Sequence, residues 1–206
     1  MSIELWLAFV VACIPLLAVP GPTVLLVVSY ALSRGKSSAW ATVPGVALGD
    51  FTAMTVSLIG AGAVLATSVT LFTALKLIGA AYLIWLGIKL WRSDPELGAF
   101  DNAEAAGSTK EMFWSAYIVT ALNPKSIVFF VAFVPQFVNT SASTLHQFVV
   151  LEITFLVLAT ISAALWAVLA GQARLKLCQP NTLKLVNRTG GGFLIGAGII
   201  TAAIRV

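Results

Sequence analysis

Long apolar runs dominate the chain, and polar or charged residues interrupt them at only a few places. Between Lys36 and Lys76 the only formally charged residue is Asp50. A helix needs about 20 apolar residues to cross a membrane, so this stretch can hold two spans and a short turn. Runs of this kind predict six transmembrane helices, at 5–31, 39–65, 71–91, 112–138, 147–170 and 188–205.

The composition agrees with an integral membrane protein. The 206 residues are 59% hydrophobic and 10% charged, whereas a soluble domain has about 25% charged residues. Mean hydropathy is +0.98. The first apolar run has no basic segment before it and no small-residue cleavage site, so we expect a retained first helix rather than a signal peptide. These features predict an all-α membrane protein.

The net charge of +4 is explained by topology rather than by a nucleic-acid partner. Nine Lys and Arg residues lie in the first, third and fifth predicted loops or at the helix ends beside them. The second loop (66–70) and the fourth (139–144) contain none. The positive-inside rule therefore predicts cytoplasmic odd-numbered loops and two extracytoplasmic termini. Because the basic residues are dispersed and no soluble domain is predicted, we expect no nucleic-acid binding.

Segments 76–88 and 187–199 match at an offset of 111 residues, which makes the third and sixth predicted helices equivalent. A unit of three helices crosses the membrane an odd number of times, so a second unit must enter from the opposite side. We therefore predict two inverted three-helix repeats, in residues 1–92 and 112–206. The small and acidic residues of 93–111 are typical of a solvated, cytoplasmic linker between them.

A second offset relates the first two helices of each half. An offset of 102 residues aligns Pro22 with Pro124 and Asp50 with Glu152. Each half then has a proline in its first helix and, 28 residues later, a carboxylate in its second. The difference of nine residues between the two offsets predicts a longer loop at 171–188.

The two aligned prolines stand where a helix could begin. Proline is favoured at the first helical position because its missing N–H would be unpaired there, and glycine and asparagine are acceptable N-caps before it. We therefore predict that the first and fourth helices break and restart inside the bilayer. The two restarts contain an N-cap, a proline and a following residue with a backbone amide: Gly21, Pro22 and Thr23, and Asn123, Pro124 and Lys125.

Such restarts predict an anion site. Unpaired amides, expected at 23–25 and 125–127, are tolerated at membrane depth only if they are buried in protein or line a wet cavity. The helix dipole there favours a carboxylate. Lys125 is unfavourable at a helix N-terminus by itself, so it also indicates an anion. The alternative is that the prolines only kink the helices and that Lys125 pairs with Glu152.

Inverted repeats are common in secondary transporters, and Asp50 is the main candidate for coupling transport to protons in such a protein. It follows Gly45 and Gly49, whose spacing lets another helix approach closely. A carboxylate at this depth costs about 2.5–3.5 kcal/mol on insertion scales, so a partner, water or a proton must compensate it. A carboxylate that holds either a proton or a substrate ammonium would exchange one for the other. Glu152 is the second candidate, and a buried hydrogen-bonded acid is the alternative for both.

Four segments resemble, in order and spacing, the lysine exporter and homoserine/threonine efflux (LysE/RhtB) family of bacterial amino-acid exporters: "PGPTVLLVV", "PGVALGD", "KLIGAAYLIWLGI" and "ALNPKSIVFFVAFVPQF". The resemblance implies a six-helix plasma-membrane protein that exports amino acids or close derivatives by proton antiport. It places the family's PGP, GD and NPK elements on Pro20, Gly21 and Pro22, on Gly49 and Asp50, and on Asn123, Pro124 and Lys125. Glu152 matches no motif of the family, and Ala116 stands near the place of an expected glycine.

Other classes of protein fit the sequence less well. A channel or structural membrane protein is the main alternative. An intramembrane aspartyl-type enzyme is disfavoured because Ala47 replaces the first glycine of a Gly-x-Gly-Asp element and no second membrane aspartate exists. Cys13 and Cys178 lie in different segments and predict neither a disulfide nor a metal site. We expect lipid contact and no cofactor, while glycine-rich faces on the second and sixth helices would permit a homodimer.

Overall fold

The structure, a computed structural model, describes residues 1–93, 108–138, 143–177 and 180–203. Every regular element within these ranges is helical. The long helices are α1 (Ile3–Ala18), α2 (Pro22–Arg34), α3 (Ala39–Thr67), α4 (Val69–Arg92), α5 (Thr109–Ala121), α7 (Thr144–Leu177) and α8 (Pro180–Ala203). The short ones are the 3-10 helix η1 (Lys36–Ser38), α6 (Pro124–Val128), the π-helical turn η3 (Phe129–Phe133) and the 3-10 helix η4 (Val134–Phe137).

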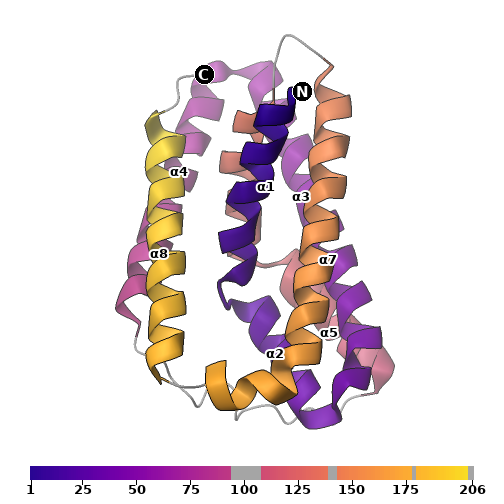
Figure 1. The fold of residues 1–206 in the computed structure, drawn as a ribbon. Coiled ribbons are helices and arrows are strands. Elements are labelled where there is room, and N and C mark those ends of the chain that lie inside the picture. Colours follow the sequence, from indigo (N-terminus) through magenta and orange to yellow (C-terminus); the bar gives the residue numbers. More distant parts are fainter. Residues whose placement is uncertain (94–107, 139–142, 178–179, 204–206) are drawn as a thin grey trace.

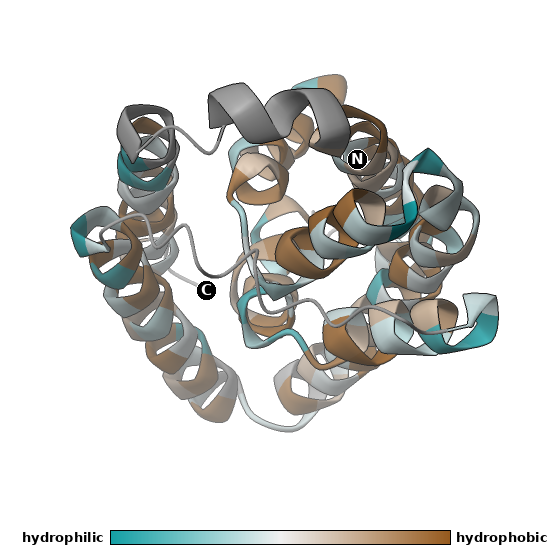
Figure 2. Ribbon diagram, turned by 90° about the horizontal axis from the view of Figure 1, so that it is seen from below, coloured by the Kyte–Doolittle hydropathy of each residue, from teal (hydrophilic) through white to brown (hydrophobic). Residues whose placement is uncertain are grey.

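The helices form an up-and-down bundle in which α1 begins at the same end as α8 finishes (Figure 1). Seen from the opposite end, brown hydrophobic segments run along the helices, and the nearer ends of several helices are hydrophilic (Figure 2). The ends of α2 and α4 and the start of α5 lie there, with the exposed residues Arg34, Lys36, Arg92 and Lys110. We call this the basic end.

Four helical stretches are long and apolar enough to cross a membrane: Lys36–Val64, Thr73–Arg92, Thr109–Phe137 and Thr144–Ala170. The bent pair of α1 and α2 counts as a fifth if it forms one span. α8 is not among these stretches in the described part of the chain, and Asn187, Arg188 and three consecutive glycines make its first half less apolar. The chain is thus a multi-pass membrane protein with four or five candidate spans, and α8 is the sixth long segment.

Two predicted boundaries in the second half were wrong. The loop expected at 171–188 is mostly helical, because α7 continues to Leu177 and α8 begins at Pro180. The apolar segment ends near residue 170, but the residues that follow are mainly good helix formers and continue α7. Proline is favoured at a first helical position, which allows α8 to begin at Pro180. The predicted linker, 93–111, also extends too far, because its last three residues belong to α5. Ser108 and Glu111 form a capping box that starts α5 at Thr109, while 94–107 lie outside the described residues.

α4 and α8 pack closely through glycines. A Cβ added to Gly87 would lie 2.8 Å from Ile195 Cγ1, and one added to Gly198 would lie 2.6 Å from Ile84 Cγ1. The offset of 111 residues exchanges Gly87 with Gly198 and Ile84 with Ile195. The contact is therefore the same when the two helices are interchanged, as expected for antiparallel helices related by a local twofold axis.

Candidate functional site

The first helix is interrupted where the proline motif lies. α1 ends at Ala18, and the Val19 N–H donates to the Pro15 carbonyl. Gly21 then caps α2 in an extended conformation, and Pro22 is its first residue. The axes of α1 and α2 differ by 54°. This break leaves the last carbonyls of α1 and the first amides of α2 facing a gap in the helix.

The second proline motif interrupts its helix less strongly. α5 ends at Ala121, and α6 begins at Pro124 after the N-cap Asn123. The Asn123 side-chain oxygen accepts a hydrogen bond of 3.1 Å from the Lys125 N–H. Thr109–Phe137 nevertheless runs as one apolar span, unlike the bent pair of α1 and α2. The second proline thus has a side-chain cap before it and a π-helical turn after α6, within one apolar span.

Three of the amides expected to be free are paired. The Lys125 amide is capped by Asn123. The Leu25 and Ile127 amides donate to the Gly21 and Asn123 carbonyls and so close the first turns of α2 and α6. The expectation was wrong there because an N-cap carbonyl accepts the first intrahelical hydrogen bond.

Lys125 reaches from α6 to the broken end of α1. Its ammonium group donates hydrogen bonds to the carbonyls of Leu16, at 3.1 Å, and Val19, at 3.3 Å. These carbonyls belong to the negative end of the α1 dipole, which compensates the cation. The alternative pairing of Lys125 with Glu152 is wrong, since Glu152 instead accepts a hydrogen bond from the Thr55 hydroxyl.

Thr23 makes the converse contact, from α2 to the break in the second half. Its hydroxyl accepts hydrogen bonds from the Asn123 amide, at 3.3 Å, and from the Thr120 hydroxyl, at 3.2 Å. The two breaks are therefore joined by side chains from both halves.

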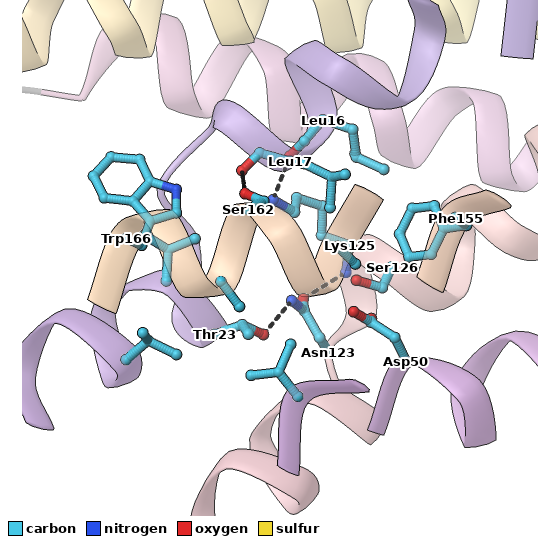
Figure 3. Close-up of a pocket in the computed structure, with 15 residues that line it drawn as sticks. Leu16, Leu17, Thr23, Asp50, Asn123, Lys125, Ser126, Phe155, Ser162 and Trp166 are labelled. Carbon is cyan, nitrogen blue, oxygen red and sulfur yellow. Dashed lines mark hydrogen bonds between the residues drawn. The ribbon is translucent and has the colours of Figure 1, made fainter. Parts of the chain in front are cut away.

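Asp50 faces a small buried cavity beside these breaks. It is 4% exposed, and the cavity has a volume of about 40 Å³. No residue in the described ranges donates a hydrogen bond to its carboxylate. Lys125 lines the same cavity but forms no ion pair with Asp50 within 4.0 Å. Figure 3 shows Asp50 and Lys125 contributed by different helices, with Lys125 extended toward Leu16.

Close packing of α3 on α5 positions Asp50. A Cβ added to Gly49 would lie 2.8 Å from Thr120 Cβ, and one added to Gly45 would lie 2.9 Å from Ala116 Cβ. Ala116 is fully buried, so an alanine fits where a glycine was expected. The two glycines allow the backbones to approach, and Asp50, next to Gly49, is thereby brought to the break in the second half.

Glu152 does not line this cavity. It lies on α7 beside Thr55, which is five residues beyond Asp50 on α3. At 1.5 Å per residue this is about 7.5 Å along the helix, toward the end opposite the basic end. The two carboxylates that the repeat aligns are thus in different surroundings.

α7 supplies cavity residues that the sequence analysis missed: Phe155, Ser162 and Trp166. Ser162 donates a hydrogen bond of 3.4 Å to the Leu17 carbonyl at the broken end of α1. The spacing of seven between Phe155 and Ser162 and of four between Ser162 and Trp166 places all three on one helix face, and this was the available signal. In the described part of the chain no group of three or more His, Cys, Asp or Glu residues could hold a metal.

Comparison with known proteins gives consistent results. Residues 14–203 match the family model described as LysE type translocator. The chain is 33% identical over 205 residues to a Vibrio cholerae protein named "uncharacterized membrane protein", with 100% of both chains covered. No solved structure matches significantly.

Two relatives have names that state a substrate. A homoserine/homoserine lactone efflux protein of Salmonella typhimurium is 30% identical over 205 residues, covering 100% of this chain and 99% of the relative. A leucine efflux protein of Enterobacter sp. is 30% identical over 152 residues, covering 74% and 69%. These matches confirm the resemblance seen in the sequence, and the chain belongs to the LysE type translocators, a family of transporters rather than enzymes.

Proposed function

We propose that this protein exports an amino acid, or a close derivative, from the cytoplasm in exchange for protons. The observation that carries the proposal is the position of Asp50 and Lys125 on one buried cavity between two interrupted helices. A zwitterionic amino acid carries one ammonium and one carboxylate group. A site with one acid and one base, not already paired to each other, can bind both ends with charge-assisted hydrogen bonds.

Lys125 is the group that binds the substrate carboxylate. Its ammonium is held by the Leu16 and Val19 carbonyls, which are uncharged acceptors. A carboxylate is a stronger partner and would displace them. Asn123 and Thr23 lie beside it and supply further hydrogen bonds. Gly21, with extended backbone beside Lys125, leaves space for the approach, since a Cβ there would lie 3.3 Å from Lys125 Nζ.

Asp50 is the group that exchanges a proton for the substrate ammonium. Its carboxylate has no donor among the described residues, so it needs a proton, water or a ligand at this depth. Substrate from the cytoplasm would displace the proton, and a proton from outside would displace the substrate. One charge moved through 100 mV supplies about 2.3 kcal/mol, enough for a gradient of about fifty-fold.

The small cavity corresponds to a closed state of the transporter. At about 40 Å³ it has room for a few water molecules. Sites for small molecules are typically about 300–1,000 Å³. Loading therefore requires the helices around the two breaks to separate.

The proposed topology has six spans in two inverted repeats, in the bacterial inner membrane, with both termini outside. The interchangeable contact between α4 and α8 supports the repeat. The reciprocal contacts of Thr23 and Lys125 support it independently. The exposed basic residues at one end of the bundle support a cytoplasmic location for that end.

Reconstitution tests this function. Liposomes that contain the purified protein and radiolabelled homoserine or leucine are diluted into a more acidic buffer, and release of the label is followed. We expect the protein to speed release, and we expect a protonophore to remove most of that effect. Release at the rate of protein-free liposomes would contradict amino-acid transport. Protein-dependent release at a rate that does not change with the pH gradient would contradict antiport and favour a channel.

A further inference from the structure

A second and larger cavity lies on the other side of Lys125. Its volume is about 380 Å³, which falls within the range of small-molecule sites. α4 forms one wall with Tyr82, Trp85 and Lys89, and the break between α1 and α2 forms another. Asn123 and Lys125 line both this cavity and the small one that contains Asp50.

Lys125 stands at the boundary between the two cavities. Of its two carbonyl partners, Leu16 lines the small cavity and Val19 lines the large one. A carboxylate in the large cavity would therefore reach the ammonium group at the Val19 carbonyl, before it enters the small cavity. Release of one hydrogen bond, to Val19, would be enough for the first contact.

The charges of the large cavity favour an anionic group and disfavour a cationic side chain. Its charged residues within the described part of the chain are Lys89 and Lys125. Lys89 is exposed, and its ammonium lies 5.3 Å from the centroid of the Trp85 ring. The Tyr82 and Trp85 rings, 5.6 Å apart, form an apolar surface next to it.

This cavity faces the basic end of the bundle. Lys89 lies in the last turn of α4, three residues before its end at Arg92. Ser93, which also lines the cavity, accepts a hydrogen bond of 3.0 Å from Asn187 of α8. The basic end is the cytoplasmic end in the proposed topology.

We infer that the large cavity is a recruitment site for neutral amino acids arriving from the cytoplasm. The substrate carboxylate binds between Lys89 and Lys125, and the uncharged side chain packs against Tyr82 and Trp85. The amino acid then passes Lys125 into the cavity of Asp50. This inference rests on the proposed export function, and it adds a second binding site and a preference for neutral over cationic amino acids.

Thiol labelling tests occupancy of this site directly. Ser93→Cys, made together with Cys178→Ser, places a thiol at a half-buried position in the lining of the cavity, while Cys13 is buried. Inside-out membrane vesicles are treated with a charged methanethiosulfonate reagent. With leucine or homoserine at about two to nine times its dissociation constant, we expect labelling to slow about threefold to tenfold, because only the unoccupied site reacts. Leucinamide and lysine should protect much less, because the first lacks the carboxylate and the second adds a cation.

Two variants provide the matched comparison. Lys89→Gln in the same background should lose most of the protection, whereas Lys36→Gln, an exposed lysine outside the cavity, should keep it. Leu90→Cys, also in the cavity lining, serves as reporter if Ser93→Cys does not insert. Absence of protection, equal protection by leucinamide, or equal behaviour of the two lysine variants would overturn the recruitment site.

Transport by the same vesicles separates this inference from the proposed function. Export of homoserine or leucine without protection at residue 93 or residue 90 would leave the function intact and remove the recruitment site. Failure of the wild-type protein to move either amino acid would contradict the proposed function itself.

Discussion

Thr23 and Lys125, each the second residue of a helix that restarts within the protein, bind to the break in the opposite half. Thr23 accepts a hydrogen bond from Asn123 at 3.3 Å, and Lys125 donates one to the Val19 carbonyl at 3.3 Å. An offset of 102 residues relates Thr23 to Lys125 in the sequence. The two breaks are thus mutually braced, and a movement that opens one must loosen the other.

Replacement of Lys125 by methionine should weaken binding of substrates that have a carboxylate. The variant keeps most of the length of the side chain but loses the ammonium group that binds the substrate carboxylate, a charge-assisted contact worth about 1.5–3 kcal/mol. We expect KM for homoserine to rise at least about tenfold. Competition by homoserine lactone, which has no carboxylate, should change little. Lys110→Met, at an exposed position, is the control; an unchanged KM in Lys125→Met would rule out the carboxylate site.

Two substitutions of Asn123 should distinguish its role as the N-cap of α6 from a role in substrate binding. Asn123→Ala removes the N-cap of α6 and the contact with Thr23, so we expect a loss of about 1 kcal/mol or more in stability. Asn123→Asp retains a capping oxygen, and it should keep more of the thermal stability in detergent while impairing transport by adding a negative charge near Asp50. If both variants were equally stable, the cap would contribute little.

Gly49 should not tolerate a side chain. A Cβ there would lie 2.8 Å from Thr120 Cβ and 2.8 Å from the Tyr117 carbonyl, so Gly49→Ala should force α3 and α5 apart at a cost of about 1–3 kcal/mol. The measurement is the midpoint of thermal unfolding in detergent. Gly60→Ala on the same helix is the matched control, because nothing lies within 4 Å of its added Cβ. Equal midpoints for the two variants would mean that the approach of α3 to α5 is looser than described.

Glu152 should be dispensable for substrate affinity. Glu152→Gln can still accept the hydrogen bond from Thr55, and the residue lies outside the cavity that contains Asp50. We expect the KM for homoserine to stay within about twofold of the wild-type value, below the effect of losing one ordinary hydrogen bond. A large rise in KM would place Glu152 in the binding site after all.

Much of this arrangement can be predicted from the sequence, for identifiable reasons. Hydropathy locates the long helices because lipid contact requires uninterrupted apolar segments. Proline and the residue before it locate the restarts at Pro22 and Pro124, since their local chemistry defines a helix start. The depth of Asp50 within an apolar run marks it as a residue that needs a partner.

Other features depend on tertiary contacts that no local pattern records. The partners of Lys125 are backbone carbonyls at the end of α1, and no residue type in the sequence indicates such a partner. Within the described residues a bend of 54° interrupts the first proline motif, whereas the second lies inside one apolar span, although both have proline at the first helical position. The end of α7 and the start of α8 follow helix propensity and the preference for proline at a first helical position rather than hydropathy, and so the predicted loop between them was too long.

The most direct test of proton exchange at Asp50 is proton-driven efflux by Asp50→Asn in reconstituted liposomes. The variant keeps the size of the side chain but cannot exchange a proton for a substrate ammonium. We predict that an acid pulse outside the liposomes will drive homoserine release through the wild-type protein, partly through Asp50→Glu and not through Asp50→Asn, at equal amounts of inserted protein. Full acid-driven release by Asp50→Asn would contradict the exchange of a proton for substrate at this residue.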